Sequence, residues 1–253
     1  MRIILAFMVL LMSGYSAGSD CVVLLHGLAR SASAMETMQQ ALTEAGYFTV
    51  NVDYPSRQYA VEKLAPMAIT PALAKCRAEN SPVIHFVTHS MGGILLRQYT
   101  KDHQIAELGR VVMMGPPNQG SQVVDHLKDI PGFEAFNGPA GMQLGTGKHD
   151  LPAQLGPVTF ELGIIAGTSS INLLLSNYLP NPDDGKVSLE NTKVTGMCAL
   201  VSVKVSHPFL MKRQKVISQV LHFLQFGKFT GKNAGHFACP AQLRSTLAIT
   251  KPD

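Results

Sequence analysis

The order in which strand-like and helix-like segments alternate constrains the fold of this chain more than any other feature of its sequence. Short apolar runs typical of buried strands occur at residues 21–26, 48–53, 83–88, 110–114, 162–167 and 199–204. Segments with apolar side chains at helical spacing separate or follow them, at residues 33–45, 61–77, 91–102 and 209–226. This alternation builds βαβ units, so we expect an α/β fold with a mostly parallel, doubly wound sheet of about six strands.

The first eighteen residues differ from everything after them. Met1 and Arg2 form a positive start, residues 3–12 are almost entirely apolar, and residues 16–18 are small. An apolar core of about ten residues is too short to span a bilayer and is typical of a signal peptide. We therefore expect residues 1–18 to be removed and the mature protein to be secreted or periplasmic. Asp20 precedes Cys21, where a lipoprotein signal needs a small residue, so no lipid is expected on Cys21.

Composition agrees with one globular domain, predicted at residues 19–226. Of the 253 residues 46% are hydrophobic and 15% are charged, which excludes a disordered or fibrous chain. The net charge is +4, but lysines and arginines are scattered and form no basic stripe. We therefore expect no nucleic-acid partner.

Two segments lack a clear periodicity. Residues 129–159 are rich in Gly and Pro and are too long for an ordinary connection. They follow a strand end on the side where parallel sheets bind ligands, so they are predicted to form a small lid or cap over the site. Residues 227–253 are predicted to be an irregular C-terminal tail.

The strongest chemical signal is the segment Val-Thr-His-Ser-Met-Gly-Gly at residues 87–93, between a predicted strand and a predicted helix. A serine hydroxyl is a poor nucleophile, and a tight strand-to-helix turn exposes it beside the amides of the helix start. Ser90 occupies that turn. The position two residues after it needs a small side chain and holds Gly92, whereas Thr88, two residues before it, departs from the pattern.

A second motif supports this interpretation. The first predicted strand ends in His26-Gly27-Leu28, and a glycine there lets the chain turn so that the amide of Leu28 points into the site. Together with the amide of Met91, it would supply the two donors of an oxyanion hole.

With these motifs the chain resembles the α/β-hydrolase superfamily, and within it the small lipases and esterases that lack the two leading strands. The resemblance runs from about residue 21 to residue 226. It rests on four stretches, which are Leu-His-Gly-Leu at 25–28, Thr-His-Ser-Met-Gly-Gly at 88–93, Gly-Pro-Pro-Asn-Gln-Gly-Ser at 115–121 and Asp-Gly-Lys-Val-Ser at 184–188. In that family the nucleophile comes first in the chain, followed by the acid and then the histidine.

That order leaves three of the nine histidines as candidates for the base, namely His207, His222 and His236. His222 lies in the amphipathic last helix and His236 in the predicted tail. His207 stands between a predicted strand and a predicted helix, so it is the preferred base.

Two neighbouring carboxylates, Asp183 and Asp184, compete for the role of the acid. The family's pattern places the acid directly before the glycine, which favours Asp184 and makes Asp183 a turn residue. Sequence alone leaves the reversed assignment open. The predicted triad is Ser90, Asp184 and His207.

Four cysteines in an exported chain allow two disulfides with three connectivities. In the fold that the resemblance implies, Cys21 and the end of the helix at residue 76 meet at one edge of the sheet. Cys198 precedes the last strand, and Cys239 follows a helix that returns to the beginning of that strand. We therefore expect the pairs Cys21–Cys76 and Cys198–Cys239.

The resemblance implies a carboxylic ester hydrolase, an esterase or lipase that acts on small-molecule or lipid esters and contacts lipid surfaces peripherally. A thioesterase, lipid deacylase or acyltransferase with the same triad is the alternative, and a non-catalytic binding protein that kept the fold is the third. We expect no metal and no cofactor, because His and Cys show no zinc-type spacing. The sequence makes no prediction of the oligomeric state.

Overall fold

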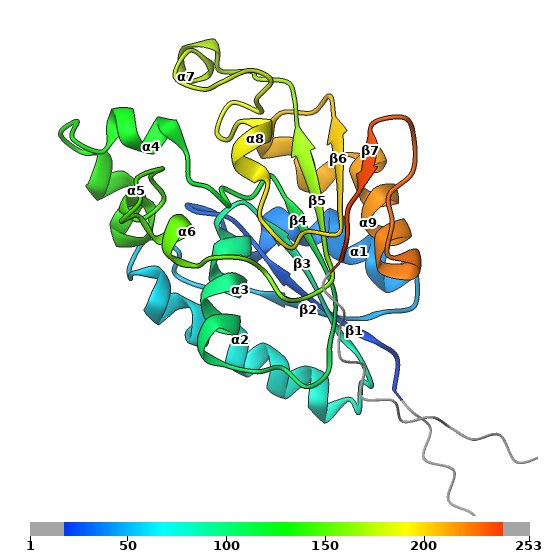
Figure 1. The fold of residues 1–253 in the computed structure, drawn as a ribbon. Coiled ribbons are helices and arrows are strands. Elements are labelled where there is room, and N and C mark those ends of the chain that lie inside the picture. Colours follow the sequence, from blue (N-terminus) through cyan, green and yellow to red (C-terminus); the bar gives the residue numbers. More distant parts are fainter. Residues whose placement is uncertain (1–17, 240–253) are drawn as a thin grey trace, which may run out of the picture.

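A twisted parallel sheet forms the centre of the molecule (Figure 1). The structure is a computed structural model that describes residues 18–239, so the predicted signal peptide, apart from Gly18, lies outside the described residues. The sheet has seven strands in the order β2-β1-β3-β4-β5-β6-β7. They are β1 (Cys21–Leu25), β2 (Phe48–Val52), β3 (Ile84–His89), β4 (Leu108–Met114), β5 (Leu162–Gly167), β6 (Ala199–Val203) and β7 (Ala234–His236). The six predicted strands are all present and pair in parallel.

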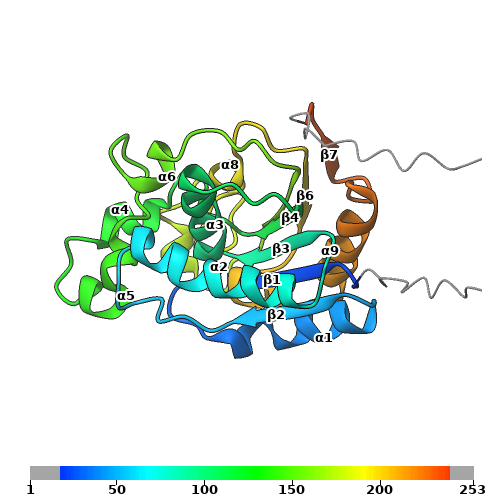
Figure 2. The same cartoon turned by 90° about the horizontal axis from the view of Figure 1, so that it is seen from below.

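Helices cover both faces of the sheet, as Figure 2 shows. One face carries α1 (Glu36–Glu44) and α9 (Gln214–Phe226), and the other carries α2 (Val61–Ala78) and α3 (Met91–Asp102). The shorter elements are η1 (Ala32–Met35), α4 (Gln122–Leu127), α5 (Phe133–Met142), α6 (Leu151–Gln154), α7 (Leu173–Ser176), α8 (Leu189–Thr192) and η2 (His207–Lys212). The predicted doubly wound α/β fold is confirmed.

Each central strand contributes to two separate cores because successive side chains point to opposite faces. Val23 and Phe86 pack with α2 and α3, whereas Val22 and Val87 pack with α1 and α9. All four side chains are fully buried. Burial on both faces explains why these strands appear in the sequence as continuous apolar runs rather than as alternating ones.

Three predictions need correction. The predicted helix at 209–226 begins only at Gln214, because Arg213 has extended backbone, and the preceding turn is the 3-10 helix η2. Residues 129–159 are not aperiodic throughout, since they contain α5 and α6, with a kink inside α5 at Gly138.

The third correction concerns the predicted tail. Residues 234–236 form β7, which pairs antiparallel with β6 in the register Ala199 with His236 and Val201 with Ala234. Three residues are too few to leave an alternating pattern in the sequence, but they cover the backbone groups of an otherwise open sheet edge. Residues 240–253 of the predicted tail lie outside the described residues.

Two disulfides join distant parts of this fold. They link Cys21 with Cys76 and Cys198 with Cys239, which are the pairs expected from the sequence. The first connects the start of β1 to the last turn of α2, and the second connects the residue before β6 to the segment after β7. Within residues 18–239, no helix combines the length and apolar character that crossing a membrane would need.

Candidate active site

Ser90 stands on a tight turn between β3 and α3. Its backbone has φ 54° and ψ −124°, a conformation that residues other than glycine rarely adopt. The turn brings α3 against β1 so closely that a Cβ atom on Gly92 would lie 2.6 Å from the carbonyl oxygen of Leu25. A Cβ atom on Gly27 would likewise lie 3.0 Å from the Cβ of Ser90. The glycines of both motifs are therefore needed for close packing. Thr88, which departs from the pattern, is fully buried.

His207 and Asp184 form a buried pair beside this turn. The Nδ1 atom of His207 lies 2.7 Å from Oδ2 of Asp184, and the amide of His207 donates to the Asp184 carbonyl at 2.9 Å. The other carboxylate oxygen of Asp184 accepts from the amides of Lys186 and Val187. Gly115 leaves room for the pair, since a Cβ atom there would lie 2.9 Å from Asp184 Oδ2.

The neighbouring carboxylate has a different set of partners. Asp183 accepts from the hydroxyl of Ser176 at 2.6 Å and from the amide of Gly185 at 2.7 Å. Both contacts hold the local turn, and none of them reaches His207. The geometry therefore pairs Asp184, and not Asp183, with the histidine.

A mostly apolar pocket of about 630 Å³ opens over the turn, and we call it the apolar pocket. Ser90, His207 and Leu28 all contribute to its lining. Its other walls come largely from α4, α5, the segment between them and the residues just after α5, including Val124, Leu127, Ile130, Phe133, Phe136 and Leu144. The predicted cap segment thus borders the same space as the serine and the histidine.

The other predicted site residues lie around this pocket in different ways. Asp184 is buried behind His207, and Met91 is the first residue of α3. The first amides of a helix lack intrahelical acceptors, so the Met91 amide is free of that partner. The Met91 side chain packs in the core, and Met142 is not among the residues that line the pocket. Leu28, by contrast, lines the pocket.

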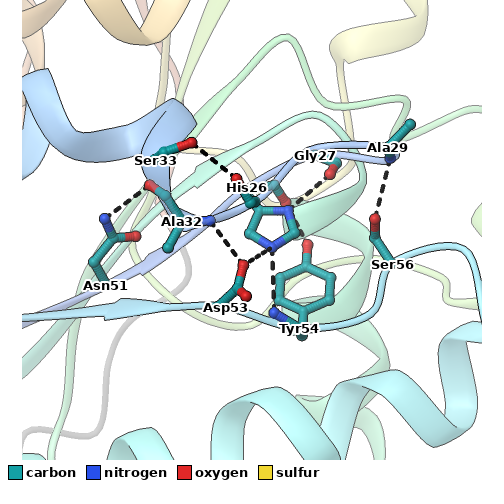
Figure 3. A network of polar contacts seen from close by, with 10 residues as sticks. His26, Gly27, Ala29, Ala32, Ser33, Asn51, Asp53, Tyr54 and Ser56 are labelled. Atoms are coloured by element: carbon teal, nitrogen blue, oxygen red, sulfur yellow. Dashed lines mark hydrogen bonds and ion pairs between the residues drawn. The ribbon is translucent and has the colours of Figure 1, made fainter.

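A network around His26 holds the loop that carries Leu28 (Figure 3). The buried imidazole stacks on Tyr54 with ring centroids 3.9 Å apart, and the Tyr54 hydroxyl donates to the His26 carbonyl. The Nδ1 atom of His26 lies 2.9 Å from the Gly27 carbonyl oxygen, which can only accept a hydrogen bond. Nδ1 therefore carries the proton, and Nε2 accepts from the Tyr54 amide. Ser56 accepts from the amide of Ala29. Burial lowers the pKa of His26, which keeps the ring neutral.

Two residues of the site were not predicted from the sequence. The first is His89, whose Nε2 donates to the carbonyl of His207 at 3.1 Å and whose ring lies 4.7 Å from the His207 ring. It is 2% exposed, and burial together with the positive charge of a protonated His207 holds its pKa well below the usual value. A neutral His89 therefore supports the loop of His207 without adding charge.

The second is Arg97, a 4% exposed guanidinium on α3. It donates to the carbonyls of Asn118, Pro152 and Gly156, and burial lowers its pKa to about 10. Asn118 in turn donates to the Thr192 carbonyl. No role was predicted from the sequence for the stretch at 115–121. In the structure its residue Asn118 links Arg97 of α3 to α8, and Arg97 itself contacts α6.

Among residues 18–239, no three or more histidines, cysteines and carboxylates gather in a way that could hold a metal ion.

Comparisons with known proteins agree with the geometry of the fold. No family model matches this chain, and no curated protein matches it significantly in sequence. Among solved structures, it is similar to the mature form of a Bacillus licheniformis lipase, with 18% identity, a TM-score of 0.64, and coverage of 83% of this chain and 92% of that one. The chain spans about half, 52%, of the propeptide form of the same lipase.

Two further structures are similar over most of the chain. An esterase from Pyrococcus furiosus shares 18% identity with a TM-score of 0.58, and 85% of each chain is covered. A metagenomic carboxyl esterase shares 21% identity with a TM-score of 0.57, covering 76% of this chain and 65% of that one. Sheet order, the Ser90 turn and these similarities together show that the chain has the α/β-hydrolase fold.

Proposed function

We propose that this protein is a serine hydrolase that cleaves carboxylic esters, with Ser90 as nucleophile, His207 as base and Asp184 as the acid that orients it. The observation that carries the proposal is the buried 2.7 Å contact of Asp184 with His207, a histidine that lines the same pocket as Ser90. The solved structures with the same fold include lipases and esterases, which supports the same conclusion.

The contact to Asp184 sets the protonation of His207 for this chemistry. The Asp184 carboxylate accepts a hydrogen bond from the Nδ1–H group of His207, so Nε2 carries the lone pair that takes the proton of the Ser90 hydroxyl during attack. The amides of Leu28 and Met91 stabilise the oxyanion, and His207 then protonates the leaving alcohol. Water, deprotonated by the same histidine, releases the acid from the acyl-enzyme. The apolar lining of the pocket suits the acyl chain.

We further propose that the mature protein works in the periplasm or outside the cell. The apolar N-terminal segment of residues 1–18 and the two disulfides support this location, because disulfides persist in oxidising compartments. The mass of the exported protein tests it: an intact N-terminus or four free thiols would contradict the proposal.

Hydrolysis of p-nitrophenyl esters from acetate to palmitate tests the catalytic proposal. We expect turnover by the wild type and a loss of about 10⁴-fold or more in Ser90→Ala. Ser218→Ala, an exposed serine on α9, is the matched control and should keep full activity. A fluorophosphonate should label the wild type and the control but not Ser90→Ala. Turnover of thioesters alone would assign a thioesterase instead, and absence of labelling in a folded wild type would assign a silent binding protein.

A further inference from the structure

A second hollow of about 890 Å³ adjoins the apolar pocket, and we call it the polar pocket. The two share Ala29 and Arg30 in their walls. Several of its lining residues, among them Asp53, Tyr54 and Ser56, belong to the network around His26, where the loops after β1 and β2 lie side by side (Figure 3). The polar pocket therefore lies next to the loop that carries Leu28, whose amide is a proposed donor of the oxyanion hole.

Three cations from three separate segments line the polar pocket. Arg30 follows β1, Arg57 follows β2, and Lys212 ends η2, the short helix that begins at His207. Within residues 18–239, none of the three forms an ion pair. The lining contains one carboxylate, Asp53, which already accepts from the amide of Ala32 at 2.9 Å. Three cations against one carboxylate leave the lining of the polar pocket with a net positive charge.

The position of Arg30 links this charge to the reaction. It lines both pockets, and its charge contributes, after burial and His207, to the lowered pKa of His89. Pro208, the neighbour of His207, lines the polar pocket as well. An ester with its acyl chain in the apolar pocket and its carbonyl at Ser90 can extend its alcohol part past Arg30 into the polar pocket.

From this arrangement, and resting on the proposed function, we infer that the polar pocket binds an anionic group, a phosphate or carboxylate, on the alcohol side of the ester. Arginine presents a planar fork of donors that matches both groups, and Arg30 and Arg57 are the residues that would bind it in this way. The substrate is then an amphiphilic ester with an apolar acyl chain and an anionic alcohol part.

A matched pair of substrates tests the inference, namely 1-octanoylglycerol and 1-octanoylglycerol 3-phosphate, both below their aggregation concentration. We expect kcat/KM of the wild type to be at least tenfold higher for the phosphorylated ester. Arg57→Gln and Lys212→Gln, each checked for an unchanged melting temperature, should each reduce this ratio about fivefold. Lys215→Gln removes an exposed lysine outside the pocket and should keep the ratio. No preference in the wild type, or equal ratios in all variants, would overturn the inference.

A binding measurement separates this inference from the proposed function. Glycerol 3-phosphate is titrated calorimetrically into Ser90→Ala and into the double variant that also carries Arg57→Gln. Binding that weakens at least fivefold in the double variant supports the polar pocket even if no ester is hydrolysed, and absence of binding overturns it. Inorganic phosphate that accelerates hydrolysis of the neutral ester, without preference for the phosphorylated one, would show a separate effector and overturn the assignment to the substrate.

Discussion

The floor and the roof of the apolar pocket are built in opposite ways. The floor consists of the ends of β1 and β3, the start of α3 and the loops of Asp184 and His207. Its polar side chains His26, Thr88, His89 and Asp184 are at most 2% exposed. Every one of these positions is fixed by packing against the sheet.

The roof, residues 122–154 with α4, α5 and α6, lies mostly on the surface. Ile130 is 52% exposed and Phe136 is 72% exposed, although both line the pocket. A Cβ atom on Gly132 would meet nothing within 4 Å. The contrast teaches that the polar groups under the proposed site are buried, whereas part of the apolar surface that would choose the substrate is exposed to solvent.

The largest effect is expected from a substitution that removes the contact between Asp184 and His207 in the floor of the pocket. Asp184→Asn should lower kcat on p-nitrophenyl butyrate about 10⁴-fold, because an amide at this position favours the wrong tautomer of His207. Asp183→Asn is the matched neighbour and should lose at most about tenfold, since the Asp183 carboxylate accepts from the Ser176 hydroxyl and the Gly185 amide and not from His207. Equal losses in the two variants would contradict the assignment of the acid.

The second prediction concerns Arg97, whose hydrogen bonds connect α3 in the floor to α6 in the roof. Arg97→Met should lower the free energy of unfolding by about 3 kcal/mol, because it leaves the buried carbonyls of Asn118 and Pro152 without their donor and also removes the hydrogen bond to the Gly156 carbonyl. Urea unfolding measures the loss. Arg213→Met, at an exposed position, should change stability by about 0.5 kcal/mol or less. An Arg97 variant as stable as the control would show that this connection carries no stability.

A third prediction changes only the roof. Leu127→Phe adds volume inside the apolar pocket from α4. The ratio of kcat/KM for octanoate against acetate should fall about tenfold, because a pocket discriminates by roughly 1–3 kcal/mol per methylene. Leu221→Phe, on α9 and outside the pocket, should keep the ratio. An unchanged ratio in Leu127→Phe would contradict the proposal that the roof determines acyl-chain selectivity.

The smallest expected effect is the contribution of His89, in the floor, to the pH dependence of stability. Burial, together with the positive charges of His207 and Arg30, lowers the pKa of His89 well below 6.5. As the pH falls through 6.5, the unfolded chain takes up a proton that the folded chain refuses, so stability decreases toward acid and is complete above pH 6.5. Between pH 6.5 and 5.5 this histidine accounts for about 1 kcal/mol. Urea unfolding at both values should show that His89→Asn loses about that much less than the wild type does.

The parts of this fold that were predictable have dense local signals. Buried parallel strands leave continuous apolar runs, and the turn at Ser90 needs glycine at position 92, so both can be recognised within a few residues of sequence. The motif order and the place of His207 between a strand and a helix favoured that histidine, whereas the choice between Asp183 and Asp184 needed the hydrogen bonds of the folded chain.

What escaped prediction depends on backbone partners far away in the chain. Arg97 and His89 donate hydrogen bonds mainly to backbone carbonyl groups, which every residue possesses. No pattern of side chains in the sequence therefore predicts their roles. Residues 234–236 gain their strand from the edge of β6 and not from their own propensity. The polar pocket gathers cations from three loops that only the folded sheet brings together.

The positions of the two disulfides set how much of the chain must reach an oxidising compartment before each bond can form. Cys21 and Cys76 are only 55 residues apart, so their bond can form once the first third of the chain is there. The bond of Cys198 must wait for Cys239, which comes after β7 and after every predicted site residue. The last edge of the sheet is therefore closed covalently only when Cys239 has also reached that compartment, and until β7 pairs with β6 this edge stays open for other chains to join.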